Sequence, residues 1–117
     1  MTKPTRYYSH KQEKRIAKNV QGKLQPNSGA TLFNKGDIST KDWLFEAKTC
    51  TKEQESFSIK REWLDKLKQE SFAMNKEYYS LVFDFGSNNN FYILDEDIFK
   101  QILELLNEVN NDERGNK

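Results

Sequence analysis

Asp37, Glu46 and Lys48 are the residues whose types and spacing are best suited to chemistry in this chain. Two carboxylates that face each other repel, and a hard divalent cation such as Mg²⁺ relieves the repulsion because it prefers oxygen ligands. A lysine beside the pair can orient a water molecule or offset charge on a pentavalent phosphorus, and a backbone carbonyl near Ala47 can complete the coordination. The pattern therefore indicates a site for a divalent metal ion, with a lysine beside it.

These side chains meet only if the segment that carries them folds as a hairpin. Two strands are predicted, roughly at residues 37–40 and 43–49, joined by Lys41 and Asp42. Counting outward from this two-residue connection places the two acids opposite each other, and the period-two alternation of a strand turns Lys48 to the same face. Because Lys-Asp is a weak hairpin turn, a slip of one residue would separate the acids.

A helix is expected upstream of the hairpin. Ser9 and Gln12 form a capping box, and helix signals continue to about Val20. Glu13 and Ile16 share the apolar stripe of this helix, so the stripe carries an acid. This acid can reach the metal directly or through water; the alternative is an acid at the edge of the stripe that extends into solvent.

Helical and strand periodicities continue through the rest of the chain and supply the elements that must hold the hairpin. A chain of 117 residues with 35% hydrophobic side chains has room for one modest core, so we expect a single domain over residues 1–117. Residues 1–8 are expected to form an arm, and residues 110–117 a disordered tail. The remaining predicted elements are a strand at 30–33, a helix at 59–74 capped by Ser58, strands at 78–85 and 91–94, and a closing helix capped by Asp95.

The two later helices each have an apolar side. In the helix at 59–74 this side comprises Ile59, Trp63, Leu64 and Leu67. In the closing helix it is wider and comprises Ile98, Phe99, Ile102, Leu103, Leu105, Leu106 and Val109.

Cysteine content and hydropathy limit the classes of protein to consider. Cys50 is the only cysteine, which excludes an intrachain disulfide and a cysteine-based metal site. The sequence has no apolar run of membrane-spanning length and no signal-peptide core near its start. We therefore expect a cytoplasmic protein.

Charge is distributed unevenly along the chain. Residues 1–24 carry seven basic groups and one acid, whereas residues 77–117 carry three basic groups and nine acids. A basic end attracts a polyanion such as DNA, although solvated helix faces of opposite sign explain the gradient equally well. The candidate DNA-binding side chains are Lys11, Lys14, Arg15, Lys18, Lys23 and Lys35.

The order Glu13, Asp37 and Glu46-Ala47-Lys48 on helix, strand and strand resembles the PD-(D/E)XK nuclease superfamily. Closest in length and order are its small archaeal-type Holliday-junction resolvases and their phage relatives. The resemblance extends from the first helix through the hairpin and the second helix. Gly36 occupies the place of the proline that names the superfamily, which is a common variation.

The resemblance implies an α/β, restriction-endonuclease-like fold with a central mixed β-sheet flanked by α-helices. It implies a structure-selective DNA endonuclease, a Holliday-junction resolvase of phage or similar origin that hydrolyses phosphodiester bonds with Mg²⁺ or Mn²⁺ in the host cytoplasm. Asp37 and Glu46 would bind the metal with help from Glu13, and Lys48 would position the attacking water or steady the transition state. Ser28 would lie near the scissile phosphate. A homodimer acting on branched four-way DNA is also implied.

Several alternatives stay open. The chain can be another small nuclease of this fold that cleaves flap, nicked or duplex DNA, or a catalytically silent DNA-binding module. It can also be an inhibitor or assembly protein whose acidic closing helix binds a partner. For the three hairpin residues the alternative is an ordinary cross-strand charge cluster in solvent, and for Ser28 an ordinary turn residue.

Overall fold

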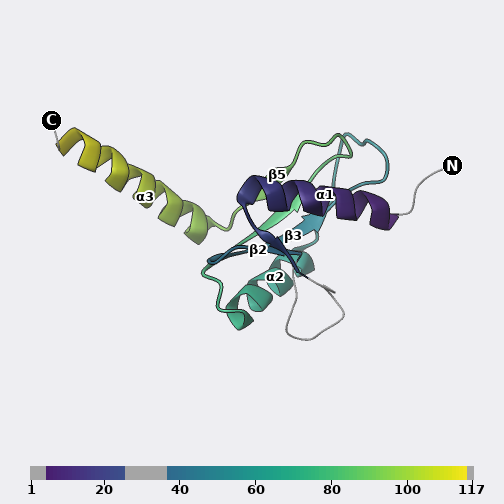
Figure 1. Ribbon diagram of the computed structural model, residues 1–117, viewed down its shortest axis with the longest axis horizontal. Helices are drawn as coiled ribbons and strands as arrows, with labels where there is room; N and C mark the ends of the chain where they lie inside the picture. Colours follow the sequence, from purple (N-terminus) through teal and green to yellow (C-terminus); the bar gives the residue numbers. More distant parts are fainter. Residues whose placement is uncertain (1–4, 26–36, 116–117) are drawn as a thin grey trace.

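The computed structural model describes residues 5–25 and 37–115 of the chain. The strand predicted at 30–33 lies outside these residues, as do Ser28 and Lys35. The elements, shown in Figure 1, are α1 (Thr5–Val20), β1 (Lys23–Leu24), β2 (Ile38–Ser39), β3 (Trp43–Lys48), α2 (Arg61–Ala73), β4 (Tyr78–Phe83), β5 (Phe91–Ile93) and α3 (Glu96–Gly115).

The five strands form one sheet in the order β1-β2-β3-β4-β5. Of the described strands, only β3 and β4 run parallel, and the other neighbouring strands are antiparallel. The parallel pair needs a crossover connection, which α2 provides. The protein is therefore an α/β protein with a five-stranded mixed sheet flanked by helices, in agreement with the class expected from the sequence. Among the described residues, no helix is long and apolar enough to cross a membrane.

The sheet separates two hydrophobic clusters, because successive side chains of a strand point to opposite faces. On the face that α1 covers, Ile16 packs with Phe45 and with buried residues of β2 and β4. On the other face, Leu67 of α2 packs with Leu44 and Leu81. Side chains of β3 thus alternate between the α1 face and the α2 face, and this alternation decides which helix each charged residue meets.

Helix α1 begins at Thr5, so the prediction of an arm over residues 1–8 and of a cap at Ser9 was wrong for residues 5–8. A proline disrupts a helix interior but allows a helix to begin directly after it. The helix ends at Val20, as predicted, two residues before Gly22. There a Cβ would lie 2.8 Å from the side chain of Ile38, so the close approach of α1 to the sheet requires glycine.

The hairpin has the predicted register. Ile38 pairs with Phe45, and the N–H of Thr40 donates to the carbonyl of Trp43 at 3.0 Å, which leaves the predicted two-residue connection at the tip. Tertiary contacts hold this weak turn. The ammonium of Lys76 donates to the Thr40 carbonyl at 2.6 Å, and the Trp43 N–H also lies 3.1 Å from the Thr40 hydroxyl oxygen.

Helix α2 begins at Arg61 rather than after a Ser58 cap. Lys60 occupies the N-cap position with an extended backbone and no side-chain cap, and Ile59 packs against the α2-face cluster instead. Trp63 and Leu64 pack against the same cluster, which confirms the predicted apolar side of this helix.

Helix α3 extends to Gly115, so residues 110–115 are helical and the prediction of a disordered tail was wrong for them. Extending an existing helix needs no new nucleus, which explains why a polar segment can continue it. The predicted cap is confirmed, since Asp95 accepts a hydrogen bond of 2.8 Å from the N–H of Asp97. The helix projects from the body of the protein and accounts for much of its 61 Å length (Figure 1).

Candidate functional site

Asp37 and Glu46 lie beside each other at the end of the β2–β3 hairpin. Extending the observed pairs by one residue beyond Ile38 places Asp37 opposite Glu46. The carboxylate of Asp37 accepts a hydrogen bond of 2.7 Å from the N–H of Ala47, and its own N–H donates to the Phe45 carbonyl at 2.9 Å. The two acids predicted to form a pair are therefore brought together by the fold.

The environment of Glu46 favours its protonated form. Burial, followed by the negative charges of Asp37 and Glu70, raises the pKa of this carboxyl, which is about 7 in the folded protein. The ammonium groups of Lys48 and Lys66 act in the opposite direction. A half-buried acid near two other acids is a group whose charge a bound cation would stabilise.

Lys48 lies on the same face as Glu46, as the strand alternation predicted. Its ammonium is 3.7 Å from a Glu46 carboxylate oxygen and 4.4 Å from the centre of the Trp63 ring. A cation over an indole ring is held by the ring quadrupole, so Trp63 restricts where the lysine can move. The ammonium is thereby positioned next to the acid pair.

Glu70 is a member of this charged group that the sequence analysis missed. It lies on α2, is only 9% exposed, and its carboxylate is 3.9 Å from the ammonium of Lys66. The available signal was helical spacing, because Glu70 follows Leu67 by three residues and Trp63 by seven, on the apolar side of the helix. An acid on an apolar stripe was the signal applied to Glu13, and it applied equally here.

Glu13 is not among the charged groups that shift the pKa of Glu46. It lies on α1, where its carboxylate is 3.8 Å from the His10 ring. Helix α1 covers the face that Phe45 and Ala47 share, whereas Glu46 has the strand parity of Leu44, which faces α2. The helical stripe was predicted correctly, but the stripe packs against the other side of the sheet.

Gln12 is the polar residue of α1 that reaches β3, and the sequence analysis treated it only as a capping residue. Its side chain is 1% exposed, and its amide nitrogen donates to the Lys48 carbonyl at 2.8 Å. The same amide lies 3.4 Å from the side-chain oxygen of Asn90, so Gln12 links the end of β3 to the loop before β5. Hydrophobic periodicity cannot identify a buried amide of this kind.

Arg15 was predicted to contact DNA, but the structure gives it an internal partner. Its guanidinium donates to Asp84 at 2.9 Å, and this carboxylate is only 2% exposed. Asp84 also accepts hydrogen bonds from the Thr49 hydroxyl at 2.6 Å and the Gly86 N–H at 2.9 Å. The ion pair lines a cavity of about 200 Å³ between α1 and the loops after β3 and β4.

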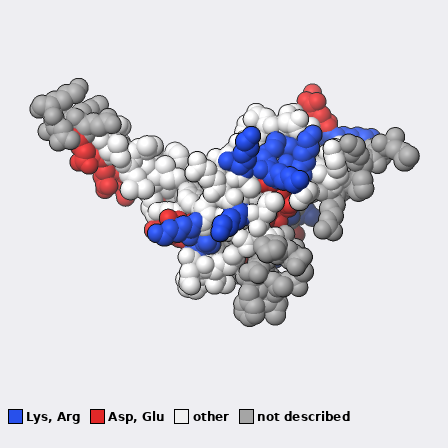
Figure 2. Space-filling view, viewed as in Figure 1, with Lys and Arg blue, Asp and Glu red and all other residues white. Residues whose placement is uncertain are grey.

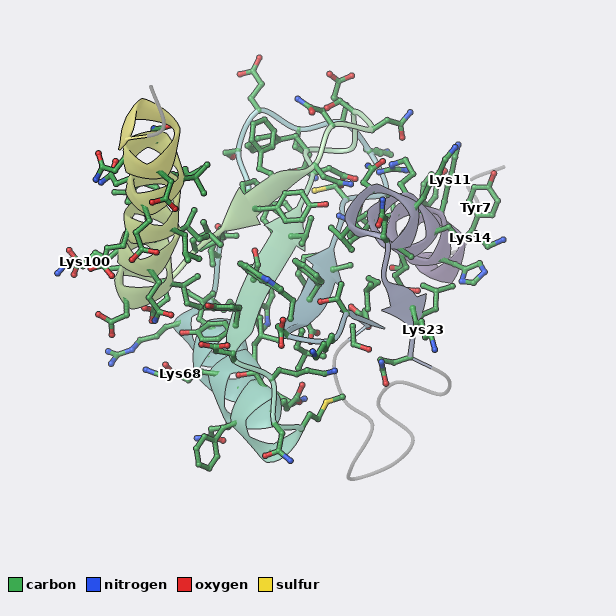
Figure 3. The ribbon with its side chains drawn as sticks, turned by 60° about the vertical axis from the view of Figure 1, so that its left-hand side comes forward. Tyr7, Lys11, Lys14, Lys23, Lys68 and Lys100 are labelled. Carbon is green, nitrogen blue, oxygen red and sulfur yellow. The ribbon has the colours of Figure 1, made fainter. Side chains whose placement is uncertain are left out.

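The other described basic residues of the predicted set are exposed. Figure 2 shows Lys and Arg side chains gathered over α1. Lys11, Lys14 and Lys18 are exposed on this helix, and Lys23 is exposed on β1. Figure 3 shows Lys11, Lys14 and Lys23 on one side of the molecule. They form a basic surface that can contact phosphates.

A second basic cavity, of about 380 Å³, lies near the tip of the hairpin. It combines lysines from β1, the hairpin turn and the connection before β4, so no single stretch of sequence indicated it. Its described lining residues are Gln21, Lys23, Ser39, Thr40, Lys41 and Lys76, and none of these is acidic.

The acid pair suits a hydrated Mg²⁺ better than a fully protein-bound metal. Among residues 5–25 and 37–115, no three acidic, histidine or cysteine side chains are grouped closely enough to hold a metal ion by themselves. Mg²⁺ usually keeps several water molecules and takes one or two carboxylates from the protein, which Asp37 and Glu46 can supply. The raised pKa of Glu46 is consistent with this interpretation, since a cation would favour the charged form.

No protein-family model matches the chain, and no curated protein or solved structure is significantly similar to it. The likeness of its motif to the PD-(D/E)XK nucleases therefore stays a prediction from residue types and order. The geometry of the hairpin and its neighbours carries the functional argument.

Proposed function

We propose that the protein is a metal-dependent, structure-selective DNA endonuclease, specifically a Holliday-junction resolvase with a restriction-endonuclease-like form of the α/β fold. The observation that carries the proposal is the juxtaposition of Asp37 and Glu46, with the Lys48 ammonium 3.7 Å from Glu46. Two carboxylates and a lysine at this spacing suit hydrolysis of a phosphodiester.

The proposed roles follow from the position of each side chain. Asp37 and Glu46 would hold Mg²⁺, which when bound lowers the pKa of a coordinated water and polarises a phosphoryl oxygen. Lys48 orients the attacking water or offsets the negative charge that develops on the phosphate, and Trp63 keeps its ammonium in place. Glu70 adds negative charge on the side of α2, which strengthens cation binding by the pair.

DNA would be held by phosphate contacts, because the described surface offers many lysines and the site itself is acidic. The lysines of the cavity at the hairpin tip, Lys41 and Lys76, adjoin the same hairpin that carries the acid pair. The exposed lysines of α1 extend this basic surface, and Lys23 belongs to both. A branched substrate presents more than one duplex arm, which suits basic residues on separated elements.

The experiment is a cleavage assay of the purified protein on labelled four-way junction, flap, nicked and linear duplex DNA in Mg²⁺ or Mn²⁺. We expect paired nicks in the junction, no activity in chelator, and a loss of roughly 100-fold or more for Asp37→Asn and Lys48→Ala. Asp65→Asn and Lys52→Ala are matched controls at exposed positions and should retain activity. A folded protein that leaves every substrate intact would overturn the proposal.

A second candidate is a DNA-binding module of this fold without catalytic activity. It is favoured by the Glu46 pKa of about 7, which leaves a large share of this carboxyl protonated at neutral pH. This candidate predicts a shifted junction in a gel, equal with and without Mg²⁺, and no cleavage product. A junction-specific shift accompanied by metal-dependent nicking would exclude it.

A further inference from the structure

Within residues 5–25 and 37–115, helix α3 is anchored to the rest of the protein only near its start. Asp95 caps it, and Ile98 in its first turn is 4% exposed. Within the described part of the chain, α3 makes no extensive packing contact with another helix or strand. In the described structure, this 20-residue helix therefore extends away from the body of the protein (Figure 1).

The unsupported part of α3 carries a continuous apolar stripe. Large apolar patches of this kind on a protein surface mark interaction sites, whereas single exposed apolar residues do not. The half-exposed side chains of the stripe are Phe99 at 49%, Leu103 at 43%, Leu105 at 54%, Leu106 at 55% and Val109 at 55%.

The spacing of the stripe is that of a helix that pairs with another helix. Phe99, Ile102, Leu106 and Val109 follow one another by three, four and three residues, which is the a and d pattern of a coiled coil. Leu103 and Leu105 flank this seam and widen it. The pattern favours a helical partner over a flat surface or a small ligand.

Charge on α3 favours a second copy of the same helix. Helical periodicity places Glu104 and Glu108 nearly opposite the seam, with Lys100 also well away from it. Figure 3 shows Lys100 pointing away from the body of the protein. Over residues 99–109, two copies can therefore approach along their seams without bringing these like charges together, whereas a basic partner would need acids beside this part of the seam.

The exposed area is also sufficient for self-association. Five large apolar side chains, each about half exposed, offer on the order of 500 Å² on one helix. Two such helices would bury roughly 1,000 Å² in total, which reaches the lower limit for a specific protein interface. The α3 helix of a second copy can therefore bury the exposed apolar side chains of this helix.

We propose that α3 is the dimerisation element of this protein and that its seam packs against the seam of α3 in a second copy. The contact uses neither the acid pair nor the basic surfaces, so it holds whether or not the protein is a nuclease. It leaves the hairpin of each copy free to engage DNA.

The test is the mass of the full-length protein by light scattering after gel filtration at about 10 µM and higher, without DNA or metal. We expect twice the 13.9 kDa of one chain for the wild type and for the control Glu104→Gln, which alters the side opposite the seam. Leu106→Glu and Val109→Glu, each at a half-exposed seam position, should give 13.9 kDa with unchanged thermal unfolding of the body.

A wild type that is monomeric throughout this range would overturn the proposal. So would a dimer that both seam variants preserve, since another surface would then form it. A monomer that joins a different protein through the same seam would also contradict it. Because the mass is measured without a cleavage assay, failure here is distinguishable from failure of the proposed function.

Discussion

The carboxylate of Asp37 accepts a hydrogen bond of 2.7 Å from the backbone N–H of Ala47, the residue between Glu46 and Lys48. This bond joins the start of β2 to the strand that carries both charged side chains. The backbone N–H of Asp37 is fixed as well, through the Phe45 carbonyl at 2.9 Å. The acid pair is therefore positioned by the fold before any ligand binds, which is the condition for a preorganised site.

The pKa of Glu46 should respond to its neighbours in opposite directions. It should titrate near pH 7, and Asp37→Asn should lower its pKa by roughly half a unit to one unit, because a repelling charge is removed. Lys48→Met should raise it by a similar amount. Carboxyl carbon NMR of the metal-free protein measures this, with Asp65→Asn as the control. A Glu46 pKa near 4.5 that neither Asp37→Asn nor Lys48→Met changes would contradict the described environment.

Glu46→Gln should stabilise the protein at alkaline pH. The folded state raises the pKa of Glu46 from 4.5 to about 7, so it favours the protonated acid. The contribution of protonated Glu46 to the free energy of unfolding is therefore fully present below pH 4.5 and is lost as the pH rises through 7. We expect the variant to gain on the order of 1 to 3 kcal/mol at pH 8 and almost nothing at pH 4.

The measurement is urea unfolding of both proteins at the two pH values, followed by circular dichroism. Equal stability of variant and wild type at pH 8 would show that Glu46 is better solvated than its surroundings indicate. A gain at pH 8 together with lost cleavage would be typical of a residue kept for function at the expense of stability.

The hairpin could be predicted from the sequence because its register depends on local quantities. A two-residue connection and the period of two fix which side chains face each other, and Ile38 does pair with Phe45 as this count requires. The apolar side of α2 was predictable for the same reason, since helical spacing alone places Trp63 and Leu67 together.

The face that each helix covers could not be predicted from the sequence. Periodicity shows that the Ile16 stripe of α1 is buried, but only the topology of the sheet decides which parity of β3 it meets. That is why Glu13 lies on the helix that covers one face of the sheet, whereas the side chain of Glu46 belongs to the other face. The surface that covers the apolar stripe of α3 could not be predicted either. Periodicity places Leu106 on this stripe but does not show what packs against it, and among the described residues Leu106 stays 55% exposed.

Asp84→Ala should destabilise the protein by about 3 to 5 kcal/mol, because it leaves the Arg15 guanidinium without its partner in a largely buried setting. Thr49 and Gly86 would lose their acceptor in the same substitution. Urea unfolding at pH 7 gives the free energy of unfolding, and Asp65→Ala is an exposed control expected to stay within about 0.5 kcal/mol.

A double-mutant cycle separates this ion pair from general loss of packing. Arg15→Ala combined with Asp84→Ala should cost less than the sum of the two single variants, since each removes the same interaction. Strict additivity would mean that the 2.9 Å contact contributes nothing of its own. A loss of DNA binding in Arg15→Ala without a loss of stability would restore the earlier prediction that this arginine contacts phosphate.

Asp95 should stabilise the start of α3 only while it is ionised. The Tyr79 hydroxyl donates to its carboxylate at 2.8 Å and the N–H of Asp97 donates to the other oxygen at 2.8 Å, and these hydrogen bonds hold the pKa of Asp95 below 3.8. A lowered acid pKa contributes stability above the unfolded value, and this is lost as pH falls through the folded value.

We therefore expect Asp95→Asn to cost about 1 kcal/mol at pH 7 and progressively less as the pH is lowered below 3.8. Urea unfolding across this range measures the difference between the two proteins. Tyr79→Phe removes the first of the two hydrogen bonds and should reproduce part of the cost, with little further loss when combined with Asp95→Asn. If the cost of Asp95→Asn were the same at every pH, the loss of stability would not come from the loss of charge. The contact between β4 and α3 would then not depend on the ionised carboxylate.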